Sequence, residues 1–217
     1  MPFGFGKKKE NPPPAAGLEP ADPHLPRRVS FHGLTETWRL QATTSITGRL
    51  LDSLNKREPL ELENVSWAPL DGSGPFEPAP GIESVDPYDL IVVLAGAETL
   101  PTLSESERMA QRIHKVTYDV ALEVPPLRVV GTVQLHPGSE PEGLVDRGTQ
   151  MFVAVTNPLV SVAGATLELD ESSGAALVNR FYLRGVQQVD LATGERHRDL
   201  PGLPLGGTTW SDKSRTR

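Results

Sequence analysis

The chain has 217 residues, a formal net charge of −7 and no cysteine. The absence of cysteine excludes disulfides, thiolate metal sites, iron–sulfur clusters and cysteine nucleophiles. The acidic balance argues against a general nucleic-acid binder, which needs Lys and Arg side chains to neutralise phosphates. Glycine and proline number 20 and 21, whereas hydrophobic residues make up only 37%. We therefore expect a folded core with long segments outside it.

The N-terminal part of the chain is rich in proline. Six prolines lie between residues 11 and 26, and each lacks an N–H donor and fixes φ. We expect residues 1–30 to be a disordered or polyproline-like segment. No apolar stretch follows its basic residues, so we expect no secretory signal and a cytoplasmic protein. The longest aliphatic run, residues 90–95, is too short for an integral membrane span.

Residues 31–100 contain short segments in which apolar and polar side chains alternate, the pattern of half-buried strands. Strands are expected at 38–42, 60–67 and 90–94. A single helical turn is expected at 51–55. This part of the chain is predicted to be a first small β-domain.

A helical connector is predicted at residues 101–114. Thr102 is followed three residues later by Glu105, the pattern of a capping box at a helix N-terminus. A helix of about three turns fits between this box and the strong strand pattern that begins at residue 115.

The second small β-domain is predicted at residues 115–192. Its clearest strand runs from 115 to 124, where Val, Tyr and Leu alternate with charged and small residues. Further strands are expected at 129–135, 151–155, 159–162, 166–169 and 181–189. Residues 193–217 are rich in glycine, proline and polar residues, and are predicted to be a flexible tail.

Short strands with turn residues between them indicate an all-β fold, here two tandem small β-barrel or sandwich-like halves. Gly48 and Gly131 lie in similar apolar segments, 83 positions apart. Asn64 and Asn157 end similar segments, 93 positions apart. These matches predict that the second half is a duplicate of the first.

The order of motifs in the first half is Ile-x-Gly-x-Leu at 46–50, Leu-Asp-Ser-Leu-Asn at 51–55, an apolar strand ending near Asn64, and the strand 90–94. This order resembles a small β-domain family found in uncharacterised bacterial proteins, and it is weakly similar to small Sm-like barrels. The resemblance implies a fold only. The family has no established activity, so no functional residue is carried over.

No pattern of residues predicts enzyme chemistry or a cofactor. The five histidines lack metal-binding spacing, and neither a nucleophile elbow nor a phosphate-binding loop occurs. Glu61 and Glu63 would share one face of a strand, which leaves carboxylate-based hydrolysis as an alternative. We expect a protein that is not an enzyme.

The N-terminal peptide is the main candidate for partner binding. Phe3 and Phe5 alternate with glycine and precede Lys7, Lys8 and Lys9. Aromatic side chains can anchor in pockets of a partner, and lysines can steer the peptide towards an acidic surface. We therefore expect a non-enzymatic interaction, adaptor or assembly protein with a protein partner. Self-association through exposed strand edges is expected as well.

A ligand-sensing β-barrel that binds a nucleotide second messenger is the alternative. Arg108 and Arg112 fit the Arg-x-x-x-Arg element of such barrels. The segment 170–174 is close to their second element, although its glycine comes one residue early.

Overall fold

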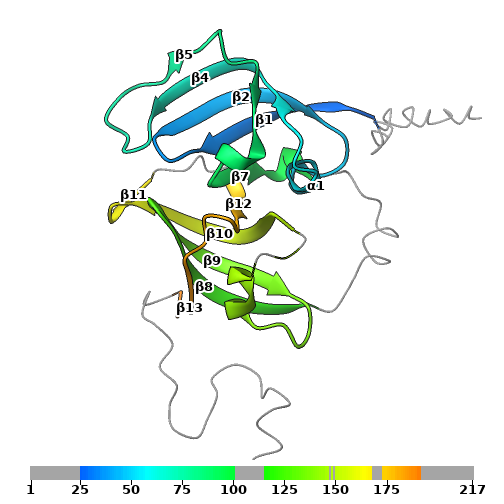
Figure 1. Ribbon diagram of the computed structural model, residues 1–217, viewed down its shortest axis with the longest axis vertical. Helices are drawn as coiled ribbons and strands as arrows, with labels where there is room; N and C mark the ends of the chain where they lie inside the picture. Colours follow the sequence, from blue (N-terminus) through cyan, green and yellow to red (C-terminus); the bar gives the residue numbers. More distant parts are fainter. Residues whose placement is uncertain (1–24, 101–114, 147, 149, 168–172, 192–217) are drawn as a thin grey trace, which may run out of the picture.

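The computed structural model describes residues 25–100, 115–146, 148, 150–167 and 173–191 (Figure 1). The expected connector at 101–114 and tail at 193–217 lie outside the described residues, as does most of the N-terminal segment. Strand β1 begins at Arg27, inside the segment 1–30 that was expected to precede the fold. It begins there because Val29 and Phe31 alternate into the core, where they are 4% and 0% exposed.

The described part of the protein is mostly β-structure, which confirms the all-β prediction. The elements of the first half are β1 (Arg27–Leu34), β2 (Trp38–Ile46), α1 (Leu50–Asn55), β3 (Leu60–Glu61), β4 (Glu63–Pro69), β5 (Glu77–Pro78), β6 (Ser84–Val85), the 3-10 helix η1 (Pro87–Asp89), β7 (Val92–Gly96) and the 3-10 helix η2 (Ala97–Thr99). Those of the second half are β8 (Val116–Val124), β9 (Leu127–Leu135), the 3-10 helix η3 (Pro141–Val145), β10 (Phe152–Val162), β11 (Ala165–Thr166), β12 (Ser173–Asn179) and β13 (Gly185–Gln188).

One large antiparallel sheet runs through both halves, in the order β13-β8-β9-β10-β12-β7-β1-β2-β4-β5 (Figure 1). A short strand, β11, adds to β10, and β3 pairs with β6 in a separate small sheet. The described residues form no closed barrel, so the barrel form of the expected barrel or sandwich-like halves is not observed. The reason is that β12 of the second half pairs with β7 of the first, and this pair joins the two halves edge to edge.

Strand β7 and the second part of β12, from Ala176 to Asn179, are buried on both faces. Along β7, Val92 and Leu94 belong to a core formed mainly by the second half, whereas Val93 and Ala95 belong to a core formed mainly by the first half. Along β12 the side chains alternate in the same way, with Ala176 and Val178 in one core and Leu177 in the other. The two cores therefore lie on opposite faces of the central pair of strands.

Two asparagine side chains tie the halves together beyond the sheet. Asn179 is fully buried, and its Nδ2 donates to the carbonyl oxygen of Leu90 at 2.8 Å. Asn55, at the end of α1, accepts hydrogen bonds from the N–H groups of Met151 and Phe152 at 2.7 and 2.8 Å. Both asparagines satisfy backbone groups that would cost free energy if buried without a partner.

The two halves share their strand order and their register. The order β7-β1-β2-β4-β5 in the first half corresponds to β13-β8-β9-β10-β12 in the second. In the first hairpin Phe31 pairs with Ala42, and in the second Val120 pairs with Gly131, so corresponding residues are 89 positions apart.

The same irregularity recurs in the third strand of each half. The register of β4 on β2 shifts between Gln41 and Thr43, and that of β10 on β9 shifts between Thr156 and Leu159. Within these shifts Asn64 and Asn157 adopt positive φ angles of 55° and 50°. This is a conformation that asparagine tolerates better than most residues.

Gly48 and Gly131, which the sequence comparison matched to each other, do not occupy corresponding positions in the two halves. Gly131 lies in the middle of β9, whereas Gly48 follows β2 with a φ of 79°. The residue that occupies the position of Gly131 in the first half is Ala42.

The close approach of β10 to β9 gives Gly131 a testable role. A Cβ at this position would lie 2.7 Å from the backbone oxygen of Thr156 and 2.7 Å from Cγ1 of Val155. We expect Gly131→Ala to lower the free energy of unfolding by about 1–3 kcal/mol, because the bulged strand has to move. Urea denaturation followed by far-UV circular dichroism measures the change.

Gly174→Ala is the matched control, since a Cβ there meets no atom within 4 Å. We expect this control to change the stability by no more than about 0.5 kcal/mol. Equal effects of the two substitutions would contradict the proposed clash at Gly131.

Candidate interaction surface

The residues that the sequence singled out for partner and ligand binding lie outside the described residues. They are Phe3, Phe5, Lys7, Lys8, Lys9, Arg108 and Arg112. Their roles stay predictions, and the surface described below is built from other residues.

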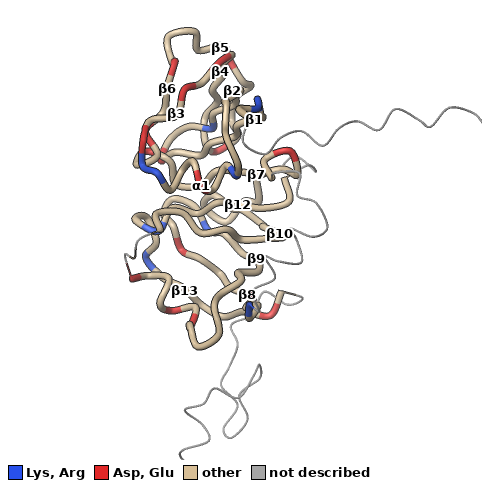
Figure 2. The backbone as a smooth tube through the Cα atoms, turned by 90° about the vertical axis from the view of Figure 1, so that its right-hand side faces the viewer, with Lys and Arg blue, Asp and Glu red and all other residues tan. Residues whose placement is uncertain are grey.

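The carboxylates of Glu61 and Glu63 do lie in the described part of the chain. With Glu83 they line a hollow of about 440 Å³ beside β3, β4 and β6, along which Figure 2 shows acidic residues. Oε2 of Glu63 lies 3.1 Å from Nη2 of Arg28, and both side chains are more than half exposed. Such an exposed pair is screened by water and contributes little to stability. Within the described residues, no three His, Asp or Glu side chains are placed to hold a metal ion.

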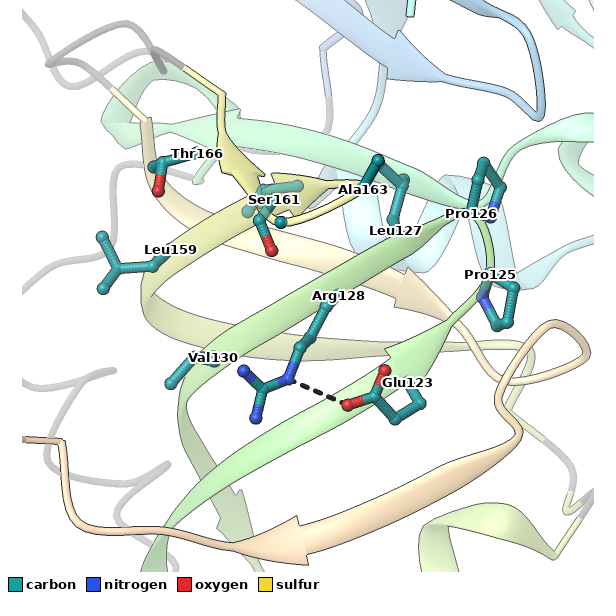
Figure 3. Close-up of a pocket in the computed structure, with 12 residues that line it drawn as sticks. Glu123, Pro125, Pro126, Leu127, Arg128, Val130, Leu159, Ser161, Ala163 and Thr166 are labelled. Carbon is teal, nitrogen blue, oxygen red and sulfur yellow. Dashed lines mark hydrogen bonds and ion pairs between the residues drawn. The ribbon is translucent and has the colours of Figure 1, made fainter. Parts of the chain in front are cut away.

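A second hollow, of about 480 Å³, lies at one end of β8, β9 and β10 (Figure 3). Its floor carries an ion pair, in which Nε of Arg128 donates to Oε1 of Glu123 at 2.8 Å. Leu159 is 60% exposed at its rim, while Pro125 and Pro126 border the opposite side. The hollow thus combines an exposed apolar side chain with a polar floor.

The corresponding place in the first half is filled. Arg39 lies 89 positions before Arg128, and its Nε donates to the carbonyl oxygen of Pro69 at 3.0 Å. The guanidinium of Arg39 also lies over the ring of Phe76, 5.1 Å from the ring centroid, in a cation–π contact. An aromatic side chain of the same half therefore covers the first arginine.

The two ends of the large sheet differ in their capacity to accept another strand. At the first end β5 pairs with β4, and the N–H of Ala79 donates to the carbonyl oxygen of Val65 at 2.8 Å. Because backbone groups alternate in direction along a strand, Pro78 faces away from β4. Pro80 follows β5 in a turn, in which the N–H of Ile82 donates to the carbonyl oxygen of Ala79 at 3.1 Å. Pro78 has no N–H, and the outer side of β5 therefore lacks the donor that a further strand would need.

The other end of the sheet is β13, at the opposite pole of the molecule (Figures 1 and 2). The N–H of Val189 donates to the carbonyl oxygen of Asp119 on β8 at 3.0 Å. By the same alternation, the backbone groups of Val186 and Gln188 face away from β8. No described strand pairs with this outer side, and no proline interrupts it.

Two side chains fix the segment that precedes β13 to neighbouring parts of the fold. Nε of Arg180 donates to the carbonyl oxygen of Leu144 in η3 at 2.9 Å, and burial lowers the pKa of this guanidinium while Asp146 opposes the shift. The hydroxyl of Tyr182 donates to the carbonyl oxygen of Tyr88 at 3.1 Å. Burial, with the nearby charges of Glu36 and Asp89, raises the pKa of Tyr182.

The sequence did not distinguish these two edges. Residues 181–189 were expected as one strand, but alternation alone does not show which strand lies at the end of a sheet. The proline at position 78 was the available signal, since proline within a strand pattern marks an edge.

Comparisons with known proteins found no match to this chain among family models, curated proteins or solved structures. The described part of the chain contains no helix with the length and apolar character needed to cross a bilayer.

If Pro78 blocks the β5 end, replacing it should open this end. We expect Pro78→Val to associate into larger species than the wild-type chain does at the same concentration, because it adds an outward N–H group to β5. Sedimentation velocity across a concentration series measures this. Pro137→Val removes an exposed proline away from the sheet edge, and it should leave the distribution of species unchanged. A Pro78→Val variant that sediments like the wild type would contradict the blocking role.

Proposed function

We propose that this chain is a non-enzymatic interaction or assembly protein that binds through the open β13 edge. The contrast between the two ends of the sheet supports the proposal, because the outer side of β5 lacks a donor at Pro78, whereas no described strand pairs with the outward backbone groups of Val186 and Gln188 in β13. Proteins usually protect long-lived strand edges, and an added strand is a common mode of protein recognition.

A second part of the proposal concerns the origin of the body. We propose that the two halves are copies of one small β-unit, in line with the family resemblance of the first half. The shared strand order and the recurrent register shift favour this, as do the positive φ angles of Asn64 and Asn157.

The N-terminal peptide is proposed as a separate docking element. Its phenylalanines, Phe3 and Phe5, would anchor in a partner, and Lys7, Lys8 and Lys9 would favour an acidic partner surface. This element and the β13 edge are independent, so the experiment has to separate them.

The experiment uses three full-length variants as bait in a native lysate, with bound proteins identified by mass spectrometry. Val186→Pro removes an outward N–H from β13, and Val186→Thr retains that N–H together with a β-branched shape that suits a strand. A third variant, Phe3→Ser with Phe5→Ser, removes the aromatic anchors. We expect a partner that wild type and Val186→Thr retain and that Val186→Pro loses.

The outcomes assign the binding element. A partner that is lost only with the phenylalanine variant places recognition in the N-terminal peptide and contradicts the edge proposal. A partner retained by all the variants places recognition elsewhere on the body and contradicts both elements. Far-UV circular dichroism of each bait establishes that a loss of binding is not a loss of folding.

A further inference from the structure

We infer that the hollow at the end of β8, β9 and β10 binds the indole ring of Trp210, from the C-terminal segment of the same chain. The inference is separate from the proposed function of the β13 edge. It is carried by the first half, in which an aromatic side chain covers the corresponding arginine, and by the side chains that the second half places where this cover is missing.

The third strands of the two halves, β4 and β10, correspond at an offset of 93 positions beyond their register shifts. Gln41 pairs with Ser66 in the first half. Val130, which lies 89 positions after Gln41, pairs with Leu159 in the second half. Because the two pairs occupy the same place on corresponding strands, Leu159 is the equivalent of Ser66.

The same offset identifies the residue that stands in the place of Phe76. The pairing of β5 with β4, continued by one residue, places Phe76 opposite Ala68. Ser161, the equivalent of Ala68, pairs with Thr166 of β11. Thr166 therefore occupies the position of Phe76, and its side chain is too short to cover Arg128 as Phe76 covers the first arginine.

The exposure of the residues beneath this position shows that the cover is missing. Ala68 is 1% exposed, whereas its equivalent Ser161 is only half-buried. The side chain of Arg128 is 43% exposed, although its Nε donates to Glu123. One face of this guanidinium is therefore open to a further ring.

The uncovered surface is also more apolar than its covered counterpart. Val130 takes the place of Gln41, and Leu159, which is 60% exposed, takes the place of Ser66. Figure 3 shows both side chains on the same side of Arg128. An apolar border beside an open guanidinium is a surface that a flat apolar ring would cover.

An indole ring suits the hollow, which has a volume of about 480 Å³. Tryptophan is the best aromatic partner of a cation, and Phe76 already makes a contact of this kind with Arg39, at 5.1 Å from the ring centroid. The indole N–H needs an acceptor when it is buried. The hydroxyl oxygens of Ser161 and Thr166, which both line the hollow, can accept this hydrogen bond.

Trp210 is an aromatic residue that the chain itself can bring to this place. It is the one Phe, Tyr or Trp in residues 192–217, and 18 residues separate it from Leu191. These residues can extend over about 60 Å. The chain leaves the sheet next to Asp119, which lies four residues before Glu123 of the hollow, or about 13 Å along β8. Attachment to the same chain raises the effective concentration of the ring, so that a weak contact suffices.

Fluorine NMR of the full-length chain labelled with 5-fluorotryptophan tests the inference, because each of the three tryptophans gives its own signal. Trp210→Phe assigns the signal of Trp210, and a synthetic peptide of residues 192–217 gives the chemical shift of the unbound ring. We expect the Trp210 signal of the full chain to be displaced from the value in the peptide.

Two variants of the hollow should return the Trp210 signal to the value in the peptide. Leu159→Ser removes the exposed apolar contact and introduces the residue type that the first half has at the equivalent position. Thr166→Phe places an aromatic side chain over Arg128, as in the first half, and should displace the indole. Thr166 and Leu159 are both exposed, so that neither substitution disturbs the core.

Val145→Ser is the matched control for Leu159→Ser, because Val145 is an apolar side chain that is 40% exposed and does not line the hollow. This control should leave the Trp210 signal displaced. The signals of Trp38 and Trp67 should stay in place in every variant, and far-UV circular dichroism reports whether each variant is folded.

A wild-type Trp210 signal at the value in the peptide would overturn the inference and leave the hollow to an aromatic side chain of another protein. A displaced signal that Leu159→Ser or Thr166→Phe leaves unmoved would overturn it as well, as would a displacement that Val145→Ser abolishes. A displacement that disappears on dilution, together with a dimer in sedimentation velocity, would place Trp210 in the hollow of a second copy and overturn the contact within one chain.

Discussion

Every side chain along β7 and along the second part of β12 has to be apolar or fully hydrogen-bonded, because these two strands lie between two cores. Val92, Val93 and Leu94 are almost fully buried, and so are Ala176, Leu177 and Val178. A continuous aliphatic run is typical of a strand covered on both faces. The pairing of β7 with β12 therefore makes one sheet out of two halves and sets which strands remain at its ends.

The position of this pair of strands explains why a buried asparagine forms a hydrogen bond at its end. Asn179 ends β12 and bonds to the carbonyl oxygen of Leu90 just before β7. A hydrocarbon side chain would fill the space at this position but leave that oxygen without this donor, at a cost of about 1–3 kcal/mol for a buried group. The buried side chain of Asn179 thus fixes the position of β12 relative to the segment before β7, because its hydrogen bond to Leu90 forms at one position only. An apolar side chain would not impose such a position.

The sequence predicted the half-buried strands well and the central ones less well. Residues 116–124 were recognised from their alternation, and α1 was expected within one residue of its observed start. Strand β12 was missed, because Ser173, Gly174 and two alanines carry no period-two signal and no strong β-propensity. Alternation describes a strand with one buried face, so it did not reveal that one sheet spans both halves, nor that β13 lies at its end.

The tie between α1 and β10 has a consequence for the time course of folding. Asn55 bonds to Met151 and Phe152, almost a hundred residues later in the chain, and β7 meets its partner only when β12 has been made. During synthesis the first half therefore leaves the ribosome with one hydrogen-bonding edge bare and part of its core incomplete. Contacts of such long sequence separation slow folding. While only the first half has been synthesised, a chaperone, or the β12 of a neighbouring chain, could bind to the bare edge of β7.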